Sequence, residues 1–141
     1  MNESSGSEVL MRRGAASLAD LAQAIREDLT EGREQDALRL IFGFADDFRG
    51  SGDAGKALLI AGEPPATGNP GFDAALAGAA EFFADEAGLP VPQWVNGPGR
   101  FAAPWFFVTS SAALHAYVLA HTPIEFSAHG VFIAREVFDR A

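Results

Sequence analysis

Apolar residues recur at three- and four-residue steps along much of the chain, which is the spacing of a helix with one buried face. This pattern, together with the residues that begin and end each stretch, predicts five helices. They run from Ser17 to the break at Gly32, over residues 33–48, 54–61 and 72–87, and over residues 112–121, where Pro123 stops the last helix. Ser17 lies three positions before Asp20, as in a capping box, and Gly88 stands at the usual stop position of the fourth helix.

Two stretches between these helices are rich in Pro and Gly. Residues 63–71 contain three Pro and two Gly, which break both helices and central strands, so we expect a surface connection there. Residues 89–104 also hold Trp94 and Phe101, and an extended segment with such side chains normally lies across a core. Apolar runs leave room for one or two short strands near residues 105–108 and 131–133. The predicted fold class is mostly α: a compact single-domain bundle of about five helices over residues 15–141, after a disordered N-terminal tail over residues 1–14.

Charge and composition narrow the function classes. The 141 residues include 19 acidic and 10 basic side chains, a formal net charge of −9, and no Cys, which excludes disulfides, thiolate metal sites and Cys nucleophiles. Fourteen acids face five basic residues between positions 14 and 98, so we expect no direct nucleic-acid binding. Residues 1–14 are polar and no apolar run is long enough to span a bilayer, so we expect a cytoplasmic protein without a membrane partner.

The three His residues are candidates for a metal site. Ligands on one face of a helix lie three or four positions apart, but His115 and His121 lie six apart and would point in different directions. His129 follows outside the predicted helix. We therefore expect no metal site, with His115 packed on its helix and His121 near the negative end of the helix dipole.

Paired acids are the other candidates for chemistry. Asp46–Asp47 and Glu81 with Asp85 are expected on the polar faces of their helices, where carboxylates are ordinarily solvated, instead of in a cleft that would separate their pKa values. The Gly-rich stretch before Lys56 lacks the glycine spacing, the Ser or Thr and the preceding strand of a phosphate loop. We expect no catalytic residue and no cofactor, so we predict that the chain is not an enzyme.

An aromatic segment remains, with Trp94, Phe101, Trp105, Phe106 and Phe107. It allows two interpretations. A domain of this length must bury its large side chains, so core packing is one; the other is that Trp105 or Phe106 anchors a protein interface. Adjacent residues of an extended backbone point in opposite directions, so if Phe106 points inward, Trp105 points outward. We take Trp105, Phe106, Asp46 and Asp47 as candidate partner-binding residues, because an acidic helical face would suit a basic partner.

Four motifs over residues 65–141 occur in a recognisable order. They are Pro65-x-Thr-Gly, Ala87-Gly-Leu-Pro-x-Pro-x-Trp94, Phe101-x-x-Pro-Trp105-Phe, and Phe126-x-x-x-Gly130-Val-Phe-Ile. This order resembles a family of small, uncharacterised actinobacterial proteins, some with a preceding helix-turn-helix module. Members are often encoded beside nucleotidyltransferase-like toxins of the AbiEii type, so the resemblance implies an antitoxin-like protein. It assigns no functional residue.

These observations lead to two functional hypotheses. The first is a non-catalytic protein-binding module that neutralises a nucleotidyltransferase-like toxin by occlusion, its acidic surface covering the basic site of that partner. The alternative is a transcriptional regulator that acts with a partner protein. The sequence leaves the partner's identity and the oligomeric state open.

Overall fold

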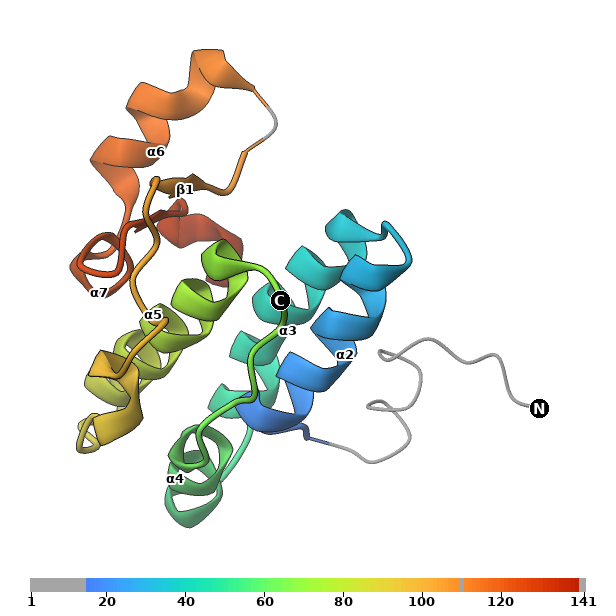
Figure 1. Cartoon of the computed structure of the whole chain (residues 1–141). Helices are drawn as coiled ribbons and strands as arrows, with labels where there is room; N and C mark the ends of the chain where they lie inside the picture. Colours follow the sequence, from blue (N-terminus) through green and yellow to red (C-terminus); the bar gives the residue numbers. More distant parts are fainter. Residues whose placement is uncertain (1–14, 110, 140–141) are drawn as a thin grey trace. The chain divides into compact units, whose positions relative to one another are not determined.

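A computed structural model describes residues 15–109 and 111–139. The predicted tail over residues 1–14 lies outside the described residues, so that prediction is not tested. The described chain is mostly helical with one two-stranded sheet, which confirms the predicted fold class and both short strands. It divides into two units, residues 1–68 and 69–141, which we describe separately as the N-terminal and C-terminal units (Figure 1). A single domain over residues 15–141 stays a prediction.

Over its described residues, 15–68, the N-terminal unit contains three helices that pack on one another. They are α2 (Leu18–Thr30), α3 (Glu34–Arg49) and α4 (Asp53–Ala61). The predicted capping box is present at the start of α2: the Ser17 hydroxyl accepts from the Asp20 backbone N–H at 3.1 Å, and the Asp20 carboxylate accepts from the Ser17 N–H at 3.3 Å. The apolar stripes of the helices face inward and supply the largest buried side chains of this unit, which are Leu18, Ile25, Ile41, Phe44, Phe48 and Ile60.

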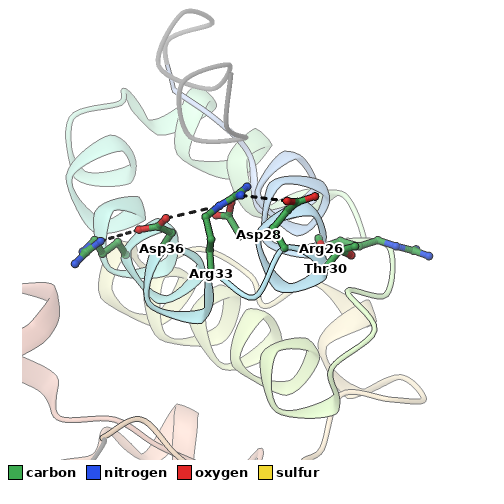
Figure 2. Close-up of polar contacts among 7 residues, drawn as sticks. Arg26, Asp28, Thr30, Arg33 and Asp36 are labelled. Carbon is green, nitrogen blue, oxygen red and sulfur yellow. Dashed lines mark hydrogen bonds and ion pairs between the residues drawn. The ribbon is translucent and has the colours of Figure 1, made fainter. Parts of the chain in front are cut away.

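An ion pair between a buried carboxylate and a partly exposed arginine fixes the short connection between α2 and α3. The Asp28 side chain is fully buried, and its Oδ1 accepts from Arg33 Nε at 3.2 Å and Nη2 at 2.9 Å. The Arg33 backbone N–H also donates to the Asp28 carbonyl oxygen, at 2.7 Å. Figure 2 shows Arg33 between Asp28 and Asp36, and the longer contact with Asp36 measures 3.8 Å. Arg33 therefore connects the end of one helix to the start of the next.

The C-terminal unit contains the remaining elements. They are α5 (Pro70–Ala87), η1 (Gln93–Asn96), β1 (Phe106–Phe107), η2 (Ala112–Leu114), α6 (His115–His121), α7 (Ile124–Ser127), β2 (Val131–Phe132) and η3 (Arg135–Phe138). Strands β1 and β2 pair in parallel, with Phe106 opposite Val131 and Phe107 opposite Phe132. Because the strands are parallel, the chain between them must cross over, and that crossover carries η2, α6 and α7.

Helix α5 is the centre of this unit and is buried on almost every side. It begins at Pro70, two residues earlier than predicted, because Asn69 caps the Gly71 and Phe72 N–H groups. Its stop at Gly88 is as predicted, with φ of 69°. A Cβ on Gly78 would lie 2.6 Å from the Phe126 ring, so this glycine lets α7 approach α5 closely. Phe82, Phe83, Phe126 and Phe138 form the aromatic core beside that contact.

Some features of this unit differ from the prediction. The predicted fifth helix keeps its bounds, residues 112–121, but it is divided into the 3-10 turn η2 and the α-helix α6. Helices η1 and α7 were not predicted at all. Beyond β2, the described chain ends in a 3-10 turn, η3, over Arg135–Phe138. Within the described ranges, none of the helices combines the length and the apolar character that crossing a bilayer requires.

Candidate functional site

The exposed large apolar side chains are concentrated in one stretch of sequence. Residues 101–124, which we term the uncharged segment, contain no Asp, Glu, Lys or Arg. Of the eight large hydrophobic side chains exposed in the described part of the chain, six belong to this segment: Phe101, Trp105, Leu114, Tyr117, Leu119 and Ile124. Exposed protein surface normally carries charged residues, and large exposed apolar groups in one region mark interaction sites. The uncharged segment is therefore the candidate site.

The Trp105 side chain is exposed on one side and packs on two aromatic rings on the other. Its ring lies 4.8 Å from the Phe132 ring and 6.5 Å from the Phe107 ring, yet 61% of the residue remains accessible. Its neighbour Phe106 points the other way and is half-buried, with the ring packed on Gly71 and 5.4 Å from the Phe72 ring. The alternation expected of two adjacent residues in an extended segment is therefore present, with Trp105 outward.

Helix α6 is held to the rest of the unit by a few contacts. Val118 is its one buried residue, and all residues of this helix are described. The His115 ring stacks on Phe107 at 4.1 Å, and the Tyr117 hydroxyl donates to Glu136 Oε2. That hydrogen bond raises the pKa of Tyr117 above its ordinary value, because the phenol donates to a carboxylate. Just beyond the helix, Thr122 Oγ1 accepts from the Ile133 N–H at 3.0 Å.

The start of the uncharged segment is positioned by His129. This side chain is buried; its Nδ1 donates to the Arg100 carbonyl oxygen at 2.7 Å, and its Nε2 lies 3.0 Å from Glu81 Oε1. A carbonyl oxygen only accepts hydrogen bonds, so Nδ1 is the donor in the contact with Arg100. The Phe101 ring stacks on the imidazole at 4.6 Å. His129 thus links α5 to the backbone that carries Phe101.

The carboxyl groups of Glu125 and Asp85 form a hydrogen-bonded pair, and the charge of Glu81 acts on it. Burial raises the pKa of Glu125 above its usual value, and the hydrogen bond with Asp85 raises it further. The negative charges of Asp85 and Glu81 also raise the pKa of Glu125. The expectation of a solvated carboxylate holds for Asp85, which is exposed, but not for Glu81, which is partly buried and contacts His129.

Asp46 and Asp47 lie in the other unit, near the C-terminal end of α3, and both are exposed as predicted. Partial burial and the neighbouring Asp46 charge raise the pKa of Asp47. The structure brings Trp105 and Phe106 together on β1 and its approach, on opposite sides of the backbone, whereas the two aspartates belong to the N-terminal unit.

Sequence reasoning missed most of the exposed apolar residues. Leu114, Tyr117, Leu119 and Ile124 were not singled out, although the run of 24 residues without a charge was a readable signal. The contact between His129 and Glu81 had no such signal, because 48 positions separate them. Among the described residues, no group of three or more His, Asp or Glu side chains is arranged to hold a metal ion.

We compared the chain with protein-family models, with curated proteins and with solved structures. None of them matches. The resemblance to antitoxin-like proteins therefore remains a hypothesis that rests on the four sequence motifs.

Proposed function

We propose that this chain is a non-catalytic, cytoplasmic protein-binding module that acts as an antitoxin-like partner. It neutralises a nucleotidyltransferase-like toxin by covering that protein's basic site. The class of partner comes from the resemblance of residues 65–141, and the docking residue comes from the geometry of the C-terminal unit. This chain itself is not expected to bind nucleic acid, because its net charge is −9.

The observation that supports the proposal is the exposed Trp105 on its aromatic base. Trp is the residue most enriched among the side chains that carry binding energy at interfaces. An anchor already held by Phe107 and Phe132 loses little conformational freedom on binding, which favours affinity. Trp105 would enter an apolar pocket of the partner, and the uncharged surroundings would exclude water around it.

The acidic N-terminal unit would contribute mainly to the rate of association. Asp46 and Asp47 are exposed and adjacent, so they attract a basic protein at long range. We expect Asp46→Asn combined with Asp47→Asn to lower the association rate and its dependence on salt, while the dissociation rate changes little.

The deciding experiment is titration calorimetry with the purified product of the gene adjacent to the one for this chain. Trp105→Ala should weaken binding by at least about tenfold and lower the free energy of unfolding by less than about 1 kcal/mol. Leu58→Ala is the matched control, because Leu58 is 72% exposed in the N-terminal unit and should bind as the unmodified protein does. No binding by the unmodified protein, or equal binding by Trp105→Ala, would refute the proposal.

A further inference from the structure

The turn that follows α7 holds the backbone that leads to Trp105. The His129 carbonyl oxygen accepts from the Ala102 N–H at 2.8 Å. The Gly130 carbonyl oxygen accepts from the Phe106 N–H at 2.9 Å. A Cβ on Gly130 would lie 2.6 Å from the Ala102 carbonyl oxygen, so the two backbones approach more closely than a larger residue would allow. The backbone leading to Trp105 therefore lies where this turn places it.

The side chain of His129 connects the turn to α5. Its ring is buried, and Nε2 lies 3.0 Å from Glu81 Oε1. Because Nδ1 donates to the Arg100 carbonyl oxygen, a neutral ring carries a lone pair at Nε2. An ionised carboxylate also offers only lone pairs. The contact between Nε2 and Oε1 is therefore a hydrogen bond only while a proton lies between the imidazole and the carboxylate.

Loss of that proton would break the connection to α5. Two lone pairs at this distance repel one another, and the Glu81 side chain, which is 28% exposed, can turn toward water. The buried imidazole then loses its contact with Glu81, and the Phe101 ring that stacks on it loses a fixed support. Among side chains, imidazole is the one that ordinarily changes its charge near neutral pH.

We propose that His129 and Glu81 form a proton-dependent latch on the backbone that leads to Trp105. The latch is closed while the imidazole and the carboxylate share a proton, and it opens as the pH rises and that proton leaves. This inference does not depend on the toxin-binding function, because it concerns the order of this backbone in the free chain.

Neighbouring charges act on the shared proton in both directions. Asp85 of α5 and Glu125 of α7 lie near the latch, and the charge of Glu81 raises the pKa of Glu125. By the same coupling, ionised carboxylates favour retention of the shared proton. The positive charge of Arg100, whose guanidinium donates to the Asp73 carbonyl oxygen, opposes it. Strand β2, which also packs on α5, contains no titratable side chain.

The test is amide hydrogen exchange of the full chain between about pH 5 and 8, corrected for the intrinsic exchange rate of each amide. Protection of the Ala102 and Phe106 N–H groups should fall at least about tenfold over this range, as expected when a hydrogen bond with a charged partner is lost. The internal reference is the Leu89 N–H, which donates to the Ala84 carbonyl oxygen at the end of α5. Its protection should change much less.

Two Glu→Gln variants separate the latch from its surroundings. Glu81→Gln keeps the contact at every pH, because an amide donates to a neutral imidazole and accepts from a charged one. Protection of the two amides should then no longer depend on pH. Glu125→Gln is the matched control, since it makes the same substitution beside the latch and should leave the pH dependence in place.

Three results would overturn the proposal. The first is constant protection of Ala102 and Phe106 in the unmodified chain, and the second is an equal fall at Leu89. The third is a pH dependence that Glu81→Gln retains or that Glu125→Gln abolishes.

Discussion

Helices α2 and α6 are both partly exposed, but their exposed side chains differ in kind. The outer side of α2 carries Asp20, Gln23, Arg26, Glu27 and Thr30, whereas α6 exposes Ala, Tyr, Leu and His. On α2, five apolar residues are buried together with Asp28, which pairs with Arg33, and the other charged side chains face water. On α6 a single residue is buried. Helix α2 therefore buries its apolar side chains within its own unit, whereas α6 leaves most of its apolar side chains exposed.

The two units also offer two mid-helix glycines in different surroundings, Gly78 buried against α7 and Gly43 exposed on α3. In the C-terminal unit a Cβ at position 78 would lie 2.6 Å from the Phe126 ring, whereas a Cβ on Gly43 of α3 would meet no heavy atom within 4 Å. We expect Gly78→Ala to lower the free energy of unfolding by about 2 kcal/mol, since overpacking exceeds the gain in helix propensity. Gly43→Ala should raise it by about 0.5–1 kcal/mol. Urea denaturation of both variants measures the two values, and equal signs would contradict the comparison.

The second prediction concerns the ion pair between Asp28 and Arg33, which connects α2 to α3 in the N-terminal unit. Arg33→Gln should lower the free energy of unfolding by about 2 kcal/mol, because it leaves the fully buried Asp28 carboxylate without its charge partner. The same change at Arg39, which is 73% exposed and pairs with Asp36, should cost less than about 0.5 kcal/mol. If denaturation gives the same loss for both, the buried pair contributes no more than a surface one.

The third and smallest effect is a pH dependence in the C-terminal unit. The pKa of Glu125 is raised in the folded chain, so the folded state holds this proton more tightly than the unfolded state does. Stability should therefore fall as the pH rises from about 4.5 through the raised pKa, and level off above it. Glu125→Gln removes the charge and still donates to Asp85, so it should stabilise the protein at neutral pH and flatten the profile.

Thermal unfolding between pH 4 and 8 tests this prediction. Glu27→Gln is the control, because Glu27 is exposed on α2 and its substitution changes the net charge by the same amount. A profile for Glu125→Gln that stays parallel to that of the unmodified chain would show that the carboxyl pair has no role.

Local signals account for the parts of the structure that the sequence predicted well. The Ser17–Asp20 capping box and the Gly88 stop depend on residues within one or two turns, so they could be read directly. Helix α7 could not be predicted, because its four residues are too few to show a periodicity. Its position depends on the packing of Phe126 on Gly78, which is 48 residues away. A propensity argument cannot include such a contact.

The candidate site was predictable only in part, for the same reason. The sequence identified Trp105 and Phe106, and their alternation on an extended backbone followed from geometry. Which of the two points outward depends on Gly71, where the absence of a Cβ leaves room for the Phe106 ring. The exposure of α6 was hidden because an apolar helix is usually buried, and the few residues that support it lie in separate elements.

The parallel pairing of β1 with β2 has a consequence for the order in which the chain folds. Twenty-three residues separate the two strands, and closing a loop of that length costs roughly 3 kcal/mol in chain entropy, whereas α2 and α3 are joined by three residues. We therefore expect the α2–α3 hairpin to form early and the crossover to close late. Trp105 meets Phe132 only when that closure is complete. The base on which the proposed partner-binding side chain packs is thus assembled after the α2–α3 hairpin, and a chain in which the crossover is still open lacks that base.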